Sequence, residues 1–236
     1  MDTSSSLPAL VAEARQGDRG AWDALVERLL PSVCALVHRH GLAEVDGDDV
    51  SRTVWLRLAD QLGRGHEPGD LWAWVSATAR DECVRLLAAR TRMTPAADVS
   101  GLDDAVPGSD AVTPRRREQA SEAFAWRTVH AEPMTRLRDS ALEPSAMVRG
   151  PGDPGRLLSL AGGGVVLELE VGAGELAGCV HPAQDATVTL HHAGAEDRTV
   201  AVDDEGAFRF EGVVSGSVQL VVTTSERALA SPWVTI

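Results

Sequence analysis

The sequence predicts an α + β protein with two domains, a helical domain at residues 1–92 and an antiparallel β-sandwich at residues 118–236, joined by a flexible linker at residues 93–117. Two observations carry this prediction. In the first part, apolar residues recur at spacings of three and four, which is the period of an α-helix. In the second part, short apolar runs are separated by polar or glycine-rich turns, which is typical of antiparallel strands. A chain of 236 residues is long enough for two such domains, each with its own core.

Four helices are predicted in the first domain. The first covers about residues 7–14, and the second covers about residues 22–37, where Trp22 begins a broad apolar face. The third covers about residues 46–62, and the fourth runs from about residue 71 to residue 92. Glycines follow the first three helices and mark their ends.

The third helix contains the stretch DDVSRTVWLRL, residues 48–58, and has two different sides. Asp46 or Asp48 is expected to cap its N-terminus, because a carboxylate accepts hydrogen bonds from the free amides there. The inward side is an apolar stripe of Val50, Val54 and Leu58. The opposite side of the helical wheel is mostly charged and holds Asp49, Arg52, Leu56 and Asp60. A leucine without a core role among charged residues predicts a surface that binds a partner.

The second domain is predicted to consist of strands and tight turns. The segment LLSLAGGGVVLELEV, residues 157–171, is typical of a strand, a turn and a second strand. Its glycines lack the Lys-Ser/Thr of a phosphate-binding loop, so they predict a hairpin turn. The sequence DDEG, residues 203–206, lacks the rest of a calcium loop and also predicts a turn.

At the end of the linker, the basic cluster Arg115–Arg117 is either a solvated linker end, which is the first interpretation, or a nucleic-acid contact.

No metal, other cofactor or enzyme activity is predicted. Cys34, Cys83 and Cys179 lie far apart and form no C-x-x-C pair, so three reduced thiols are expected. The histidines at positions 38, 40, 191 and 192 are not flanked by ligands at metal-binding spacing. The sequence offers no local Ser/His/Asp or Cys/His set for nucleophilic catalysis.

The charge and the apolar content limit the classes of partner. The net charge is −13, with 14 Asp/Glu and 11 Arg in residues 1–92 but 21 Asp/Glu and 11 Arg in residues 93–236. A dedicated nucleic-acid binder is normally basic, so any DNA contact here needs a local patch or a partner that supplies affinity. No stretch approaches the roughly 20 apolar residues that span a bilayer, and MDTSSSLPAL does not read as a signal peptide. A cytoplasmic location without membrane contact is therefore expected.

The helical domain resembles region 2 of bacterial RNA polymerase sigma factors of the extracytoplasmic-function (ECF) type. The resemblance rests on LVAEARQGDRGAWDALVERLLPSVCALV, then DDVSRTVWLRL, then WAWVSATARDECVRLL, and covers about residues 7–92. It includes Pro31 within the second helix, the acidic start of the third helix, and a tryptophan followed by Ala-Arg in the fourth. These features occur in order and with suitable gaps. A generic helical bundle is the alternative interpretation.

The resemblance implies roles for two sets of residues. In such factors the third helix docks on the clamp helices of the largest subunit of core RNA polymerase, and the following loop and fourth helix capture promoter DNA around −10. The polymerase-binding residues implied here are Asp48, Asp49, Arg52, Thr53, Leu56 and Asp60. The DNA-binding residues implied here are Trp72, Arg80, Arg85, Arg90 and Arg92, where the tryptophan would stack on a base and the arginines would meet phosphates. On this basis Leu56→Asp is expected to abolish docking in a folded domain, and Arg52→Gln to strengthen it.

The sequence also departs from the family pattern. Arg52 and Thr53 stand where Gln followed by an acid is usual, and Asp81 and Arg85 also differ from the common residues. The helix-turn-helix region that reads the −35 element in these factors is not recognised, and β-like sequence stands in its place. Residues 176–222 loosely resemble the carboxypeptidase-regulatory or transthyretin-like sandwich, a pattern that implies a module for binding a protein partner.

Three hypotheses follow. The first is a sigma-factor-like protein that binds core RNA polymerase and −10 DNA, with a β-sandwich that binds an unidentified protein partner. The second is a non-initiating regulator or decoy, which keeps the helical domain for docking and uses the sandwich for partner binding. The third, an enzyme of unknown chemistry, is disfavoured because no catalytic set is clustered in the sequence.

Overall fold

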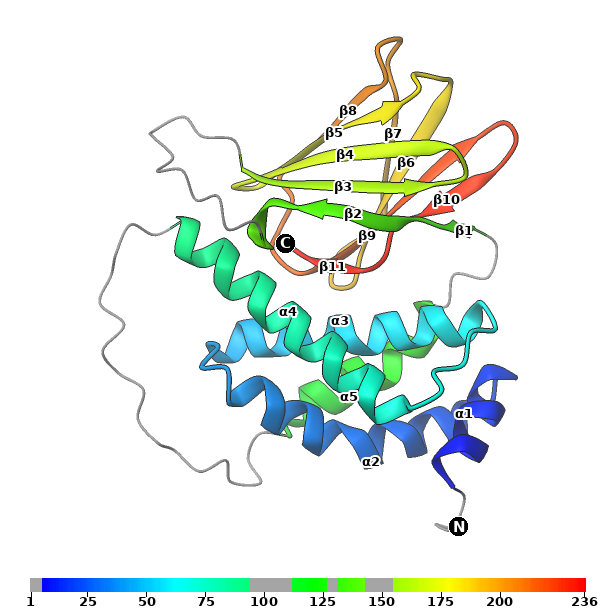
Figure 1. Cartoon of the computed structure of the whole chain (residues 1–236), viewed down its shortest axis with the longest axis vertical. Coiled ribbons are helices and arrows are strands. Elements are labelled where there is room, and N and C mark those ends of the chain that lie inside the picture. The colour runs from blue at the N-terminus through cyan, green and yellow to red at the C-terminus, as the bar shows by residue number, and fades with distance from the viewer. Residues whose placement is uncertain (1–5, 94–111, 127–130, 143–154) are drawn as a thin grey trace. The chain divides into compact units, whose positions relative to one another are not determined.

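The computed structural model describes residues 6–93, 112–126, 131–142 and 155–236 of the chain, with the side chains of residues 89–93 and of residue 142 excepted. Its residues divide into two compact units, one of residues 1–87 and 94–129 and one of residues 88–93 and 130–236. The first unit is helical and the second consists mainly of antiparallel strands (Figure 1). The predicted α + β organisation is therefore confirmed at this level.

The helical unit contains five α-helices and a 3-10 turn among its described residues. They are α1 (Leu7–Arg15), α2 (Arg19–His38), α3 (Glu44–Gly63), α4 (Leu71–Met93, with residues 71–87 in this unit), α5 (Pro114–Glu122) and η2 (Ala123–Trp126). Ser6, Asp18, Asp70 and Thr113 each precede a helix and accept a hydrogen bond from a backbone amide in its first turn. These side chains satisfy donors that the first turn of a helix leaves without intrahelical partners.

The core of this unit is built from α2, α3 and α4. Trp22 of α2 and Trp55 of α3 are fully buried and meet edge to face, with ring centroids 6.0 Å apart. Val50, Val54 and Leu58, the predicted inward stripe, are also completely buried. The amphipathic stripe therefore predicted the core side of α3 correctly.

The start of α3 differs from its prediction. The helix begins at Glu44, and its N-cap position, Ala43, provides no side-chain hydrogen bond. Asp46 and Asp48 lie inside the helix and are 6% exposed each. Neither carboxylate is the N-cap residue, because the helix starts one turn earlier than the sequence predicted.

Residues 114–126 differ most from the sequence-based domain boundaries. The sequence predicted a linker to residue 117 and a β-sandwich from residue 118, but α5 and η2 are helical and belong to the first unit. They pack against α2 and α3. The rest of the predicted linker, residues 94–111, lies outside the described residues.

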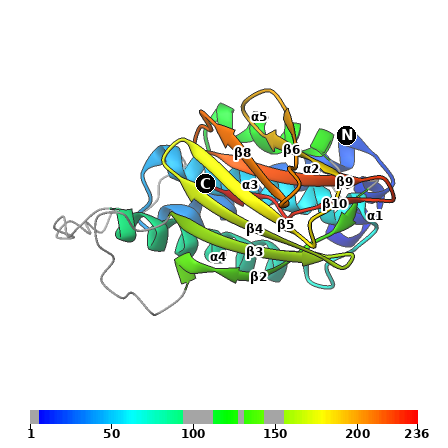
Figure 2. The same cartoon turned by 90° about the horizontal axis from the view of Figure 1, so that it is seen from above.

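The second unit contains two sheets. Its strands are β1 (Glu132–Pro133), β2 (Thr135–Asp139), β3 (Arg156–Gly162), β4 (Val165–Gly172), β5 (Glu175–His181), β6 (Ala186–His192), β7 (Arg198–Ala201), β8 (Ala207–Glu211), β9 (Ser217–Thr224), β10 (Ala228–Ala230) and β11 (Val234–Thr235), with a 3-10 turn η3 (Ser140–Leu142) after β2. One sheet has the order β1-β10-β9-β6-β7, and β11 also pairs with β9. The other has the order β2-β3-β4-β5-β8, and Figure 2 shows β2 to β5 side by side. Each described pair is antiparallel except β1 with β10.

Side chains from both sheets form one apolar core. Leu167 and Phe210 come from the five-stranded sheet, and Val188 and Val222 come from the six-stranded sheet; each of the four is completely buried. The alternation of buried and exposed residues along β4 sends every second side chain into this core. Burial of one face of each sheet therefore follows from the period of two in the sequence.

Both predicted turns are present. Gly163 and Gly164 connect β3 to β4 with φ angles of 54° and 79°, a backbone conformation that favours glycine. In the turn before β8, the carboxylate of Asp203 accepts hydrogen bonds from the amides of Glu205 and Ala207 at 3.0 and 2.7 Å. This side chain stabilises the turn, as the first interpretation of DDEG predicted.

Within the described residues, none of the helices combines the length and the apolar character that crossing a membrane requires.

Candidate partner-binding face of the helical unit

The predicted partner side of α3 is in contact with α5. The guanidinium Nε of Arg116 donates to the Asp48 carboxylate at 2.5 Å, and both side chains are more than 90% buried. Arg116 also donates to the backbone carbonyl of Glu44 at 3.4 Å. The strength of an ion pair between buried groups depends strongly on its geometry. The pair of Arg116 with Asp48 therefore fixes the position of α5 along the start of α3.

The buried ion pair affects a neighbouring thiol as well. Burial alone would lower the pKa of Arg116, but the carboxylate of Asp48 outweighs it, and the net direction is upward. Burial raises the pKa of the Cys34 thiol on α2, and the adjacent Arg116 opposes that rise. Arg116 thus connects α5 to both α2 and α3.

The remainder of α5 and η2 contacts α2. The indole Nε1 of Trp22 donates to the carbonyl of Ala120 at 2.9 Å, and the Phe124 ring lies 5.5 Å from that of Trp22. Ser121 donates to Asp23 at 2.9 Å, and Arg117 pairs with Glu27 at 2.6 Å. All three arginines of the basic cluster therefore approach carboxylates of α2 or α3, since Arg115 also lies 3.8 Å from Asp48. The side chains of Arg115 and Arg117 are 65% and 49% exposed, so the interpretation as a solvated linker end is wrong for Arg116 and for the linker, but not for the exposure of the other two arginines.

Arg52 lies on the same side of α3 as Asp48. With the Gln119 amide oxygen turned toward α3, it accepts hydrogen bonds from Arg52 and from Arg115 Nε. Burial lowers the pKa of Arg52, and the nearby carboxylate of Asp49 opposes the decrease. Asp48 and Arg52 are thus brought together by the structure, and α5 contacts both.

The other predicted polymerase-binding residues are less accessible than expected. Thr53 is completely buried, and Leu56 is 1% exposed. Asp60 is 8% exposed and accepts from Arg64 Nε at 3.0 Å. The expectation that Leu56 faces water is wrong, because buried positions occur on several sides of α3 and not only along its inward stripe. Leu56→Asp would place a carboxylate in a buried position, so the variant is now expected to destabilise the protein.

The predicted DNA-binding residues of α4 fall into two groups. Trp72, in the first turn, is 39% exposed, and Arg80 is exposed two turns later. Arg85 instead pairs with Glu82 at 2.6 Å and with Asp81 at 3.5 Å, and its side chain is 12% exposed. The side chains of Arg90 and Arg92 lie outside the described residues. The structure therefore leaves Trp72 and Arg80 accessible and places Arg85 in an ion pair.

A buried charge cluster joins α3 to α4. Glu82 is 1% exposed, and its Oε1 lies 2.7 Å from Arg57 of α3 as well as 2.6 Å from Arg85. Burial lowers the pKa of Arg57, and Glu82 opposes this decrease. Sequence patterns alone do not reveal this cluster or the role of Arg116, because each depends on pairing between helices. A signal for α5 does exist in the sequence: Thr113-Pro114 is a common helix start, and Ala120, Ala123 and Phe124 follow at helical spacing.

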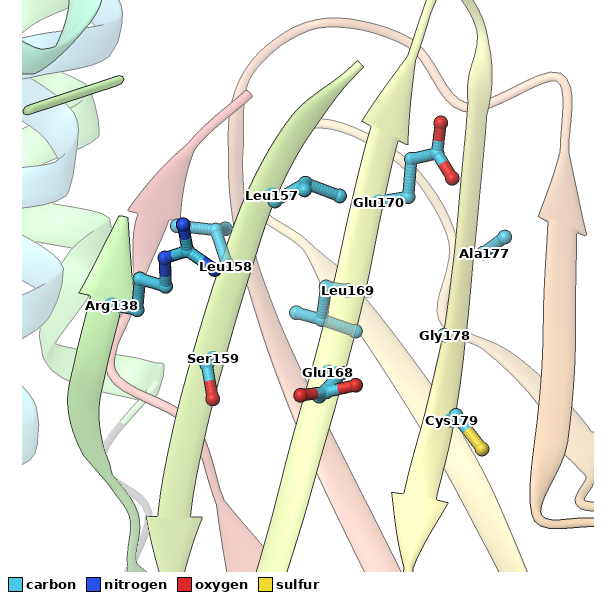
Figure 3. A pocket seen from close by; sticks show the side chains of 10 residues that line it. All are labelled: Arg138, Leu157, Leu158, Ser159, Glu168, Leu169, Glu170, Ala177, Gly178 and Cys179. Carbon is cyan, nitrogen blue, oxygen red and sulfur yellow. The ribbon is translucent and has the colours of Figure 1, made fainter. Parts of the chain in front are cut away.

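The second unit carries an open hollow of about 410 Å³ on the five-stranded sheet (Figure 3). Arg138, Glu168 and Cys179 are among its lining residues, and they come from β2, β4 and β5. Gly178 forms part of its floor, where an added Cβ would lie 2.5 Å from the Phe208 ring. Glu168 is mostly exposed and its nearest described ion-pair partner is His181 at 3.6 Å. The hollow gathers no convergent set of buried polar groups, which a small-molecule site requires.

The cysteines are expected to differ in reactivity. Cys34 and Cys83 are completely buried, and burial raises the pKa of Cys83 to about 12, with the charge of Glu82 adding to the rise. Since the thiolate is the nucleophile, the native chain at pH 8 should react with N-ethylmaleimide at Cys179, which is partly exposed, and far more slowly at the other two. Peptide mass spectrometry would measure this, with the urea-unfolded chain as the control that labels all three. Equal labelling of all three cysteines in the native chain would contradict the burial of Cys34 and Cys83.

In the part of the chain that the structure describes, no cluster of three or more His, Cys, Asp or Glu side chains could hold a metal ion.

Comparison with known proteins adds no relative. The chain matches no protein-family model, no curated protein and no solved structure.

Proposed function

We propose that the helical unit is a sigma-factor-like module that docks on core RNA polymerase through α3. The observation that carries the proposal is the ordered set of region 2-like motifs, which falls on α1 to α4 of one compact unit. Asp48 and Arg52 lie on the same side of α3, where they provide opposite charges for register with a partner helix. The proposed partner surface is the pair of clamp helices in the largest polymerase subunit.

Two accessible residues of α4 support contact with promoter DNA around −10. Trp72 offers an exposed aromatic face on which an unpaired base can stack, and Arg80 offers a charge for phosphate. Arg80 makes no ion pair with any described residue, unlike Arg85. Among the predicted residues whose side chains the structure describes, Trp72 and Arg80 are therefore the best-placed DNA contacts.

The second unit is proposed to be a β-sandwich that binds a protein partner. Two sheets whose apolar faces share one core are the arrangement that a sandwich uses. Its acidic balance disfavours nucleic acid as its ligand. The chemistry expected of its partner is a basic protein surface.

The docking proposal predicts saturable binding of the full chain to purified core RNA polymerase. Asp49→Arg should weaken binding at least tenfold, because the acidic side of α3 then carries the opposite charge at a half-buried position. Asp204→Arg makes the same charge change in an exposed turn of the second unit and serves as the control. The dissociation constant, measured by biolayer interferometry at low salt, checks both. Equal binding by the two variants would contradict docking through α3.

A second candidate is a non-initiating regulator, and the covering of α3 by α5 favours it. In vitro transcription with core polymerase and a library of promoter fragments separates the two candidates. Transcripts that depend on the full chain, and that decrease for Trp72→Ala, indicate initiation. Polymerase binding without any dependent transcript indicates a regulator.

A further inference from the structure

The contacts of α5 indicate that this helix blocks the partner side of α3, and this autoinhibitory contact is called the lock below. We propose that α5 and η2 act as an internal ligand of α2 and α3, and that the partner side of α3 becomes available only when α5 undocks. The identity of the partner as core RNA polymerase rests on the proposed function. The lock itself depends only on the contacts of α5.

α5 has the character of a docked segment. It spans nine residues, PRRREQASE, and a helix of this length is marginal in water unless packing stabilises it. Two of the buried apolar side chains of α5 and η2, Ala120 and Ala123, are small, and the third, Phe124, packs on Trp22 with ring centroids 5.5 Å apart. Polar contacts supply much of the attachment, including the pairs of Arg116 with Asp48 and Arg117 with Glu27. An interface with one large apolar side chain and several polar contacts can open while the contacts of Trp55 with the rest of the core are kept.

The same residues cannot serve α5 and a partner together. Arg116 occupies the carboxylate of Asp48, and Gln119 lies against the guanidinium of Arg52. Because docking of α5 and binding of a partner at these groups exclude each other, the partner's apparent affinity equals its intrinsic affinity multiplied by the fraction of chains in which α5 is undocked. Arg115, Arg116 and Gln119 also show the chemistry that fits this face, which is a helix with cationic and amide side chains on one side.

Two variants of the full chain release α5 through different contacts. Arg116→Asp sets a carboxylate against Asp48, and Ala120→Glu places a charge at a completely buried position beside Trp22. Glu118→Lys, at an exposed position of the same helix, is the matched control. Hydrogen exchange of residues 114–126 reports docking, and the dissociation constant for core RNA polymerase reports access to α3.

The lock predicts a specific combination of results. In both release variants, residues 114–126 should exchange at least tenfold faster while residues 20–60 remain protected. Their dissociation constants for core polymerase should be about tenfold lower than that of the wild type, and the control should match the wild type in both measurements. Addition of polymerase to the wild type should accelerate exchange at 114–126.

Three outcomes would overturn the lock, and they differ from one another. If residues 20–60 lose protection together with α5, then α5 is an integral helix of the unit. If α5 is released but polymerase binds all chains equally, docking on polymerase stands and the lock is wrong. If α5 is released and no chain binds polymerase, the proposed function fails and the lock on it fails as well.

Discussion

Replacement of Glu82 by glutamine is expected to destabilise the helical unit by about 3 kcal/mol or more. The carboxylate is 1% exposed and faces two guanidiniums, Arg57 at 2.7 Å and Arg85 at 2.6 Å. Glutamine keeps the shape but removes the charge, so Arg57 and Arg85 would lose the buried carboxylate that both face, while Asp81, 3.5 Å from Arg85, is exposed to solvent. Breaking a buried pair by removing one partner costs several kcal/mol, because the remaining charge stays desolvated.

The neighbouring carboxylate provides the control for this prediction. Asp81 is 64% exposed and lies 3.5 Å from Arg85, so Asp81→Asn should change stability by less than about 1 kcal/mol. Urea unfolding followed by tryptophan fluorescence measures both variants, because five of the six tryptophans lie in residues 22–126. A free energy of unfolding for Glu82→Gln within error of that for Asp81→Asn would contradict the role assigned to the cluster.

The first four helices and most of the strands after β2 were predictable because each carries its own periodic signal. Trp22 and Val50 belong to stripes that need a core whatever helix packs on them, and the alternation along β4 likewise assigns one side to the interior. The glycines at 163 and 164 predicted their turn because the required backbone conformation favours glycine. Local rules of this kind need no knowledge of the neighbouring element.

The position of α5 was not predictable in the same way. Its docking depends on Arg116 meeting Asp48, a residue 68 positions away, and its sequence is among the most polar of the chain. A polar segment beside a Pro/Ala/Ser-rich stretch indicates a linker when only local composition is considered. The burial of Leu56 could not be predicted from local sequence either. A helical wheel assigns a residue to one side of its helix but does not show which element covers that side.

Because local sequence does not show which element covers α3, the predicted polymerase-binding residues need a different interpretation. Arg52 and Leu56 belong to that set because they share the charged side of the helical wheel, and Asp48 belongs to it through the resemblance to sigma factors. The structure instead gives Asp48 a buried partner and Arg52 an amide contact, both from α5, and it buries Leu56. Docking through these residues then requires α5 to leave them, so the binding test and the exchange test of α5 must be interpreted together.

In the second unit, Asp139→Asn is expected to destabilise the fold by about 3–5 kcal/mol near neutral pH. The Asp139 carboxylate accepts from Arg156 Nε at 3.0 Å and Nη2 at 2.7 Å, and also from the amide of Ala141 at 3.1 Å. Arg156 in turn donates to the carbonyl of Thr235 at 2.7 Å, so one buried guanidinium connects β2, β3 and β11. Loss of the charge leaves Arg156, whose side chain is 9% exposed, without its counter-ion.

The pH dependence of this effect has a definite sign. Burial alone would raise the pKa of Asp139, but the hydrogen bonds and charge of Arg156 outweigh it, and the net direction is downward. A carboxyl group with a lowered pKa in the folded state contributes stability that is complete above its unfolded pKa, near 3.9. That contribution is lost as the pH falls from there through the folded pKa. The stability difference between the wild type and Asp139→Asn should therefore be constant from pH 8 to pH 5 and should shrink below about pH 4.

Native-state hydrogen exchange of the β3–β4 hairpin measures this difference at pH 7 and pH 5, and urea unfolding extends it below pH 4. Glu175→Gln is the control, because Glu175 pairs with Arg209 at 3.1 Å on the surface, where both side chains are more than one-third exposed. It should alter stability by less than about 1 kcal/mol at any pH. A difference for Asp139→Asn that grows on acidification would show that the charged form is not the one the fold stabilises. The buried pair would then have to be described as a neutral carboxyl beside a guanidinium, which the bidentate geometry at 2.7 and 3.0 Å opposes.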